Sequence, residues 1–467
     1  MVSSSGGPIA SAPAFVLLLG LCTAIWSGYC GLPAVAAIII ALMAASAWVL
    51  LGSRRLVAGL APEFLLILLL VAAGSMWSLH SMPSANAFPS SLDTEARVLQ
   101  SRKWGRSTAL LLDTKYGRLV TYISRNNIAE GSLVRVRGAV FDLAAAKKER
   151  GFNEFLFWRA RGAQKKLVTF AIKATEPPSG LPKWRIALSK RINAVLPERM
   201  AGYMLALTVG ARDEKLTETH RSTGTLHLLA VSGFHVAIAA GLAMLFFRRG
   251  ILRIVGVSVA VWFYVLFAGA PAGGLRAALM LQIFLLGLAV GRPSNGFNSV
   301  SAAGVLLLIW NPWYLFDVGW QLSMSAALFI SAAASLAKNT WRSAAAVSML
   351  VWLVTAPIVA YYFDELPLAG LFVNVLAVPL FSVIFPAVLI CSAPLLLGFC
   401  WFSFAAGVCE YFLESWDIFA EIISELLPWQ IGFTFSLMIT GILVFLAAAA
   451  AACGFFEIKN GKLASDM

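Results

Sequence analysis

The stretch HLLAVSGFHVAIAAG, residues 227–241, combines residue types that could build a site inside a membrane. His227 and His235 are two of the four histidines in the chain, and Ser232–Gly233 lies between them. Polar groups within an apolar segment are costly in a bilayer, so their presence indicates function. Ser232 could be a nucleophile with a histidine as its base, or the histidines could bind a metal. Alternatively, Ser232–Gly233 could break a helix beside a path, or the histidines could only hydrogen-bond to neighbouring helices.

The composition indicates that a bilayer surrounds the elements that position these residues. Hydrophobic residues make up 60% of the chain, charged residues make up 13%, and the mean hydropathy is +0.81. A soluble domain has about 45–50% apolar and about 25% charged residues. Between His80 and Pro182 the chain carries 17 Lys and Arg against 8 Asp and Glu, a net +9 of its total +13. This segment favours nucleic acid or anionic lipid as a partner, and solvation beside lipid headgroups is the alternative.

Apolar runs predict about 10–12 membrane helices. Arg54 and Arg55 place the loop between the second and third helices in the cytoplasm, so the basic segment 81–182 is expected outside it. All six cysteines lie in apolar stretches, which predicts no disulfide framework for that segment. The expected apolar helices are Phe15–Cys30, Ala34–Leu51, Phe64–Leu79, Leu226–Phe247, Ile251–Gly269, Leu275–Val290, Ser299–Trp310, Val318–Leu336, Ser343–Phe363, Leu368–Leu397 and Thr434–Cys453.

Between Ser91 and Ile172 the pattern changes to short β-rich runs separated by Gly, Asn and basic turns. The length and the number of runs predict a small antiparallel barrel of the OB type. Arg135 and Arg137 alternate with apolar residues, which predicts a half-buried strand with a cationic face; the apolar residues are Leu133, Val134, Val136, Val140 and Phe141. Trp104 and Tyr122 could stack on bases or belong to the barrel core.

Three other segments have helical patterns. Gly151–Ala163 follows the predicted strands, and Lys183–Leu196 has the apolar and basic faces of an interfacial amphipathic helix. In Trp401–Leu427, four carboxylates form one acidic stripe: Glu410, Glu414, Asp417 and Glu421. Because carboxylates facing lipid are costly, this helix is expected at the interface or beside a watery cavity.

The stretch HLLAVSGFHV is similar to the hallmark of the ComEC competence family, inner-membrane channels for incoming DNA. The segment RVRGAVFD, with the FNEFLFWRARGA that follows it, also resembles the N-terminal unit of that family. The likeness covers roughly residues 60–390. Three further segments resemble the family in the same order: 263–280 through Ala268, Gly269, Arg276 and Ala277; 311–327 through Pro312, Asp317, Gln321, Leu322 and Ser323; and 355–380 through Pro357, Asn374 and Pro379.

The resemblance implies a channel component that passes single-stranded DNA into the cytoplasm during natural transformation. Arg276 would be a phosphate ligand or a partner of Asp317, with snorkelling towards headgroups as the alternative. The resemblance also implies that the other path candidates are His227, Ser232, Gly233, His235, Gln321, Ser323, Pro357 and Asn374. In the barrel, the candidate contacts with DNA are Arg135, Arg137, Trp104 and Tyr122.

Two departures from the family pattern limit what is carried over. Gly274 stands where the family has a small hydroxyl residue, and the metallo-β-lactamase-like domain of many members is absent from this sequence. Four histidines cannot supply a binuclear metal site of that class, and the sequence has no phosphate-binding loop for nucleotide hydrolysis. We therefore expect no catalytic residue, metal or cofactor. The rivals are a family paralogue that moves another polyanion or solute, and an intramembrane serine hydrolase that uses Ser232.

The predicted organisation is a polytopic α-helical membrane protein with an inserted OB-like barrel. Its expected location is the inner membrane. Expected partners are single-stranded DNA, the lipid bilayer, an outer DNA receptor, a cytoplasmic helicase or single-strand binder, and further copies of the chain in a homo-oligomer. The expected domains are N-terminal helices at 1–80, the extracytoplasmic barrel at 81–182, interfacial helices at 183–221, the channel domain at 222–455 and a cytoplasmic tail at 456–467.

Overall fold

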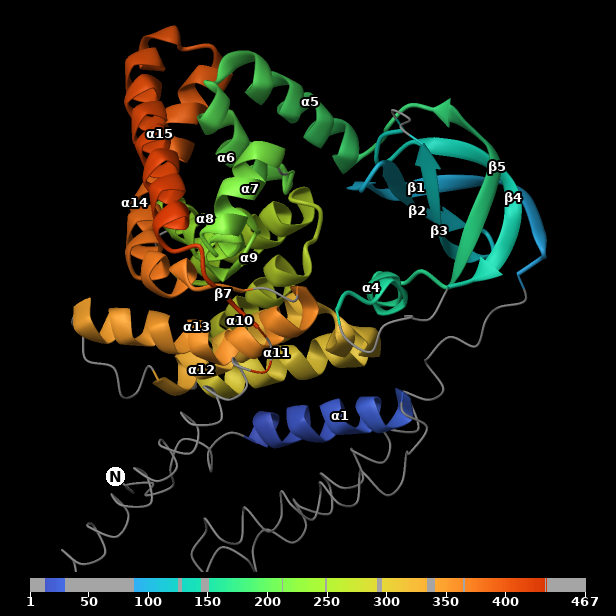
Figure 1. Cartoon of the computed structure of the whole chain (residues 1–467), viewed down its shortest axis with the longest axis horizontal. Coiled ribbons are helices and arrows are strands. Elements are labelled where there is room, and N and C mark those ends of the chain that lie inside the picture. Colours follow the sequence, from blue (N-terminus) through green and yellow to red (C-terminus); the bar gives the residue numbers. More distant parts are fainter. Residues whose placement is uncertain are drawn as a thin grey trace, which may run out of the picture.

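The computed structural model describes residues 13–29, 88–124, 128–143, 151–211, 213–247, 250–291, 296–333, 341–363, 366–432 and 434. They form a β-barrel beside a block of helices (Figure 1). The predicted helices Ala34–Leu51 and Phe64–Leu79, with nearly all of Thr434–Cys453, lie outside the described residues.

The barrel is closed by five strands in the order β1-β2-β3-β5-β4, as predicted for an OB-like domain. All pairs are antiparallel except β3 with β5. The first four strands coincide with the predicted runs, whereas no pattern singles out the fifth as a strand. The strands are β1 (Ser91–Trp104), β2 (Ser107–Thr114), β3 (Gly117–Ser124), β4 (Leu133–Asp142) and β5 (Lys165–Glu176).

Strand β4 has the predicted half-buried character with one exception. Val134 and Val136 are buried in the barrel core, while Arg135 and Arg137 point outwards. Phe141 was expected on the apolar side but is 54% exposed. Side chains alternate between the two faces of a strand, and Phe141 shares the parity of the two arginines, so the period of two places it outside.

Helix α4 (Glu154–Ala160) connects β4 to β5 and covers one part of the barrel, as the pattern in Gly151–Ala163 predicts. Asn153 caps it, because its Oδ1 accepts a hydrogen bond from the Leu156 N–H at 3.1 Å. Trp158 is fully buried with apolar side chains of the barrel. The other face of α4 lies against the helical block, where the Asn311 side-chain amide donates to the Ala160 carbonyl at 2.9 Å.

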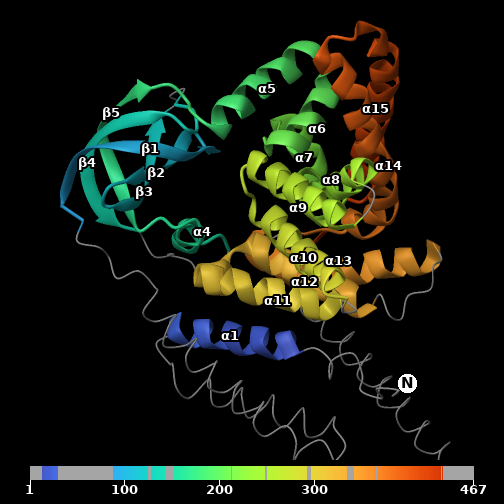
Figure 2. The ribbon, with the colours of Figure 1, turned by 180° about the vertical axis from the view of Figure 1, so that it is seen from behind.

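The helical block contains four described helices that are long and apolar enough to cross a membrane: α9, the segment Ala346–Phe363 of α13, α10 and α14. The chain is therefore a multi-pass membrane protein. Figures 1 and 2 show α14 and α15 standing beside α5–α7, while α11–α13 and α1 lie across them. The helices are α1 (Pro13–Tyr29), α5 (Leu181–Val195), α6 (Glu198–Val209), α7 (Glu214–Ser222), η1 (Leu226–Leu229), α8 (Gly233–Phe246), α9 (Gly250–Phe267), α10 (Ala272–Ala289), α11 (Gly296–Trp310), η2 (Pro312–Phe316), α12 (Val318–Ala333), α13 (Trp341–Phe363), α14 (Ala369–Leu397), η3 (Cys400–Phe402) and α15 (Ser403–Leu426), and the short strands β6 (Leu366–Pro367) and β7 (Gln430–Ile431) pair near the end.

The predicted span Leu226–Phe247 is broken into two pieces. The short turn η1 ends at Leu229, and α8 begins at Gly233. Ser232 between them has extended backbone angles, with φ −123° and ψ 179°. The structure therefore confirms that the helix breaks at Ser232–Gly233.

Helix α15 packs part of its acidic stripe against the N-terminus of α6. Arg199 Nε donates to Asp417 at 2.8 Å, and both carboxylate oxygens of Glu410 accept backbone N–H bonds, from Arg199 at 3.0 Å and Met200 at 2.8 Å. Asp417 is buried and Glu410 is half-buried, whereas the other two carboxylates of the stripe are exposed. A cation and a helix end therefore stabilise two of the four carboxylates, and the position of the helix at the interface or beside a watery cavity stays a prediction.

Candidate functional site

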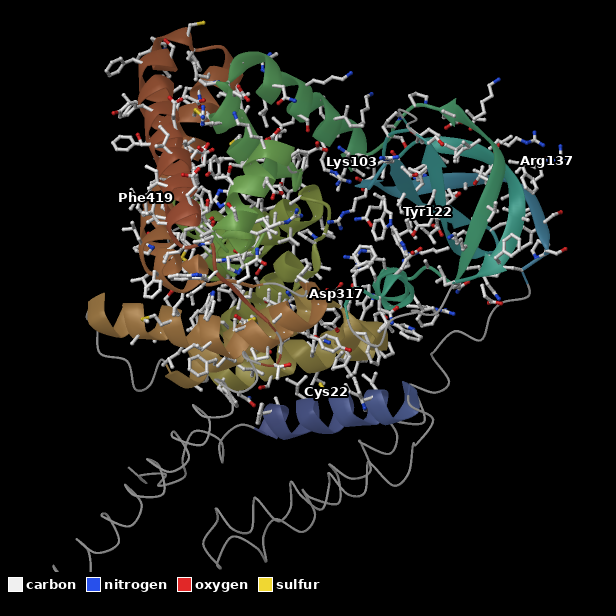
Figure 3. The ribbon with its side chains drawn as sticks, viewed as in Figure 1. Cys22, Lys103, Tyr122, Arg137, Asp317 and Phe419 are labelled. Atoms are coloured by element: carbon white, nitrogen blue, oxygen red, sulfur yellow. The ribbon has the colours of Figure 1, made fainter. Side chains whose placement is uncertain are left out.

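The barrel and the helical block meet around Asp317, which lies between α4 and the helices (Figure 3). Asp317 precedes α12 and is only 7% exposed. Its Oδ1 accepts the Trp320 N–H at 2.9 Å and so caps the helix. Its Oδ2 lies 3.2 Å from Nη1 of Arg161, the residue that follows α4. One carboxylate therefore caps a membrane helix and holds the soluble domain.

Arg276 reaches the same helix end from α10. Its Nη2 donates to the Gly319 carbonyl at 2.7 Å, in the first turn of α12. Arg276 is 2% exposed, and its Nε and Nη1 have no hydrogen-bond partner among the described residues. This position excludes the snorkelling alternative, because the guanidinium is enclosed by protein. Arg276 lies near Asp317, as expected, but Arg161 makes the ion pair.

Arg102 of β1 adds a third cation on the barrel side. The guanidinium of Arg161 lies 3.5 Å from the centre of the Phe157 ring, and that of Arg102 lies 5.7 Å from it. Burial lowers the pKa of Arg102 and Arg161, and the negative charge of Asp317 opposes this shift. We call Arg102, Arg161, Arg276 and Asp317 the junction cluster. Three cations share one carboxylate there.

The Ser232–Gly233 loop packs against the start of α10, next to the junction cluster. A Cβ on Gly273 would lie 2.9 Å from the Val231 carbonyl oxygen, and a Cβ on Gly274 would lie 3.3 Å from the Val231 side chain. Close packing against Val231 therefore favours glycine at both positions. A larger side chain at position 274, such as the hydroxyl residue of the family pattern, would press on the Val231 side chain.

Ser232 and His235 contact each other across the first turn of α8. The Ser232 N–H donates to His235 Nδ1 at 3.1 Å, and the Ser232 hydroxyl lies 3.1 Å from the same nitrogen. His235 is buried and packs on Phe385, with ring centroids 5.1 Å apart. Because Nδ1 accepts the backbone N–H, it carries no proton, and the hydroxyl donates to it. The pair stabilises the broken helix end and also has the geometry of a nucleophile with its base.

His220, which no sequence pattern singled out, belongs to a buried polar network, whereas the predicted His227 does not. His220 of α7 is enclosed, with Tyr203 Oη 2.8 Å from Nε2 and Thr225 Oγ1 2.7 Å from Nδ1. Burial lowers the pKa of His220 to about 3, so it is neutral at physiological pH. His227 in η1 is exposed. His220 is thus a structural histidine, a role that the sequence did not assign to it.

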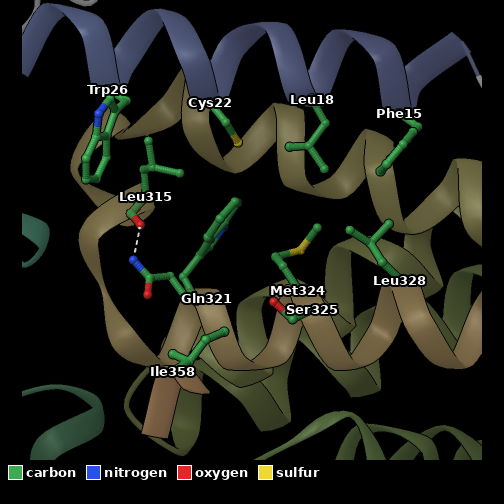
Figure 4. A pocket seen from close by; sticks show the side chains of 11 residues that line it. Phe15, Leu18, Cys22, Trp26, Leu315, Gln321, Met324, Ser325, Leu328 and Ile358 are labelled. Carbon is green, nitrogen blue, oxygen red and sulfur yellow. Dashed lines mark hydrogen bonds between the residues drawn. The ribbon is translucent and has the colours of Figure 1, made fainter. Parts of the chain in front are cut away.

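The other path candidates are not in the junction cluster. Asn374 on α14 is buried, and its side-chain amide donates to the Gly370 carbonyl of its own helix at 2.7 Å. Gln321 on α12 donates to the Leu315 carbonyl at 2.8 Å. Ser323 is half-buried on α12, and Pro357 lies inside α13. Gln321 also lines a pocket of about 290 Å³ between α1, α12 and α13, whose walls are mostly apolar (Figure 4). Such walls do not suit a polyanion.

The predicted DNA contacts of the barrel lie on different sides. Arg137 is on the side turned away from the helices, and Arg135 shares its face of β4 (Figure 3). Tyr122 and Trp104 belong to an aromatic cluster around Trp158, with ring centroids of Trp104 and Tyr122 6.0 Å apart. The Tyr122 hydroxyl donates to Glu154 and accepts from Trp158 Nε1, both at 2.6 Å. Tyr122 therefore has a structural role, and its contact with bases stays a prediction.

Comparison with known proteins identifies the family. Residues 207–456 match the family described as Competence protein, which is more than half of the chain. The chain belongs to the competence protein family. It is 30% identical over 293 residues to "ComE operon protein 3" of Bacillus subtilis (strain 168), covering 59% of this chain and 36% of that relative. It is 29% identical over 199 residues to "Competence protein ComA" of Neisseria gonorrhoeae, covering 39% and 28%.

The chain is also 32% identical over 154 residues to "Uncharacterized protein YcaI" of Escherichia coli (strain K12), covering 32% of this chain and 19% of that protein. The chain thus spans well under two thirds of each of these relatives. The family match begins at residue 207, so Asp317 and Arg276 lie inside it, whereas Arg161 and Arg102 lie in the barrel before it. Among the described residues, no group of three or more His, Cys, Asp or Glu side chains could hold a metal ion.

Sequence reasoning missed the two barrel arginines of the junction cluster. Arg161 belongs to the run RARGA, in which two arginines follow an aromatic helix, and this was the available signal. Nothing in the sequence pairs it with a carboxylate 156 positions later.

Proposed function

We propose that this chain is a channel component of the inner membrane that passes single-stranded DNA into the cytoplasm during natural transformation. The supporting observation is that the buried residues Arg276 and Asp317, both in family-like segments, lie at the junction with a basic barrel, where Arg161 pairs with Asp317. The chain belongs to the competence protein family, and one relative is named "Competence protein ComA". A polyanion that crosses a bilayer needs such cationic groups, because its phosphates lose their hydration there.

In this proposal the barrel lies outside the cytoplasm and receives the strand. Its outward arginines attract phosphates through a salt-dependent term. Arg135 is paired with Asp93 at 3.0 Å, which lowers the pKa of that carboxyl, whereas Arg137 stands beside it on the same exposed face. Other proteins supply motion and hand over the DNA: an outer receptor, and a helicase or single-strand binder in the cytoplasm.

The serine hydrolase alternative has one contact in its favour, the 3.1 Å approach of the Ser232 hydroxyl to His235 Nδ1. A catalytic histidine is normally oriented by a third group. No carboxylate among the described residues hydrogen-bonds to His235, whose ring packs on Phe385 instead. If Ser232 and His235 lie beside a path for DNA, the same hydrogen bond is explained without catalysis, because it stabilises the first turn of α8 after the helix break.

Uptake of end-labelled DNA tests the proposal. A strain deleted for the gene would be complemented with the wild type, Arg276→Ala or Arg253→Ala at matched membrane levels. Arg253 is an exposed cation on α9, so its variant changes the net charge equally. We expect deletion to abolish entry of label into the cytoplasm, Arg276→Ala to leave it abolished, and Arg253→Ala to restore it. Unchanged entry in the deletion strain would show that DNA import is not the function.

A further inference from the structure

The guanidinium of Arg276 lacks the acceptors that a buried cation requires. Nη2 has one bond, to the Gly319 carbonyl, while Nε and Nη1 are buried with no partner among the described residues. A buried donor left unpaired is costly, and the cost is larger for a charged group. Asp317 does not fill this need, because no hydrogen bond joins it to Arg276, and its two oxygens bond to Trp320 and Arg161 instead. The unpaired edge of Arg276 is therefore suited to an anion.

The charges at this place are also unbalanced. Arg102, Arg161 and Arg276 come from the barrel, the end of α4 and α10, and Asp317 is the carboxylate among them. The N-terminus of α12 adds a partial positive charge, since the first backbone N–H groups of a helix point outwards. Arg276 and Asp317 are buried, Arg161 is 26% exposed and Arg102 is exposed, so the anion site has an enclosed side at the helix N-terminus and a side that solvent reaches.

The geometry favours phosphate over other anions. The fork of a guanidinium matches two oxygens of one phosphate, and backbone N–H groups at a helix N-terminus supply further donors. The ring of Phe157 lies beside Arg161 and Arg102, and Trp104 packs on that ring with centroids 5.3 Å apart. Flat rings next to a phosphate site suit a nucleotide, whose base can stack on them.

We propose that the junction cluster binds one backbone phosphate of single-stranded nucleic acid at the N-terminus of α12, and that Asp317 is the anion with which this phosphate competes for Arg161. The proposal rests on the proposed function and names the contact by which the strand is held. Competition keeps the site from retaining each phosphate, because Asp317 returns to Arg161 when the strand advances. A translocating channel needs such weak, repeated binding.

Two substitutions at the cluster test this in opposite directions. Arg276→Gln removes the unpaired cation, so binding should weaken by about 10- to 100-fold, as expected for loss of charge-assisted hydrogen bonds. Asp317→Asn keeps the helix cap, since Asn caps as well as Asp, but removes the competing charge. It should tighten binding by about 10-fold or more. Misfolding cannot produce a gain, so the second variant keeps the test valid if the first is unstable.

The assay is fluorescence anisotropy of a labelled oligothymidylate with the purified full chain in lipid nanodiscs, titrated at fixed salt. Arg253→Gln is the matched control for loss of one cation and should bind within about twofold of the wild type. The phosphate could come from a nucleic-acid backbone or from a lipid headgroup. Competition by an abasic deoxyribose-phosphate oligomer, and separately by vesicles of phosphatidylglycerol, distinguishes these two sources. We expect the abasic oligomer to compete and the vesicles not to.

Equal binding by wild type and Asp317→Asn, or weaker binding by Asp317→Asn, would overturn the proposal. Competition by the lipid vesicles alone would assign the site to headgroup phosphate and overturn the nucleic-acid source. Failure of the uptake test with intact oligonucleotide binding would refute the proposed function but not the phosphate site, so the two failures are distinguishable.

Discussion

Glu410 is predicted to be the carboxylate of the acidic stripe that contributes most to stability. It belongs to α15 and caps α6, two helices that are more than 200 residues apart in sequence. Pro197, at the N-cap position of α6, has no side-chain acceptor. The N–H groups of Arg199 and Met200 therefore depend on the two oxygens of Glu410, at 3.0 and 2.8 Å. Glu410→Gln replaces one oxygen with an amide that faces an N–H donor.

The magnitude follows from these two bonds. Loss of an N-cap acceptor costs about 0.5–2 kcal/mol, and loss of a negative charge at a helix N-terminus costs about 0.3–1 kcal/mol. Together they predict a loss of about 1–3 kcal/mol. If the helical block unfolds as a unit, the thermal midpoint should fall by roughly 2–12 °C, on the scaling of about 2–4 °C per kcal/mol for domains of about 150–250 residues.

The measurement is thermal unfolding of detergent-solubilised protein, followed by size-exclusion chromatography of the remaining folded fraction. Glu414→Gln is the matched control. Glu414 lies on the same stripe but is half exposed, and its carboxylate is 3.5 Å from Arg199 Nη1. An exposed ion pair contributes about 0–1 kcal/mol, so this variant should melt close to the wild type. If Glu410→Gln melts with the wild type, or both variants lose the same amount, the capping explanation is refuted.

Two further predictions concern the hydroxyl and histidine groups near the broken helix. Ser232→Ala should retain most DNA uptake, and a serine-reactive probe should label neither it nor the wild type; loss of both labelling and activity in Ser232→Ala alone would instead support hydrolase chemistry. The pKa of His220 is lowered by burial to about 3 from an ordinary 6.5, so the stability it contributes is complete above pH 6.5 and is lost as the pH falls towards 3. The loss at pH 5 is about 2 kcal/mol, so the thermal midpoint should fall between pH 7.5 and pH 5, and His220→Gln should reduce this difference. An equal fall in wild type and variant would contradict the prediction.

Local patterns in the sequence were sufficient for most elements. The alternation in β4 predicted its buried and cationic faces, and the small, polar pair Ser232–Gly233 predicted the break before α8. The amphipathic pattern of Lys183–Leu196 corresponds to α5. Each of these features depends on residues close to one another in the chain, and this is why a single sequence reveals them.

Features that depend on distant partners were missed. Strand β5 is bulged and mostly exposed, so it lacks the alternation of the other strands. The contact between the acidic stripe and Arg199 was not predicted, because Arg199 is 218 positions before Asp417. Arg161 was not paired with Asp317 for the same reason. Sequence spacing indicates which side chains share a face but not which surface that face will meet.

The ion pair between Arg161 and Asp317 has a consequence for the order in which the chain assembles. The barrel strands β1 to β5 span residues 91–176, and all their pairings lie within that range. Contacts close in sequence form first, and chains fold from the N-terminus during synthesis. The barrel can thus be folded before α12 is synthesised. Arg161 would then already be positioned at the surface of the barrel. When Asp317 enters the membrane later, the arginine is already in place to neutralise it, so the soluble domain acts as a template on which the membrane half closes.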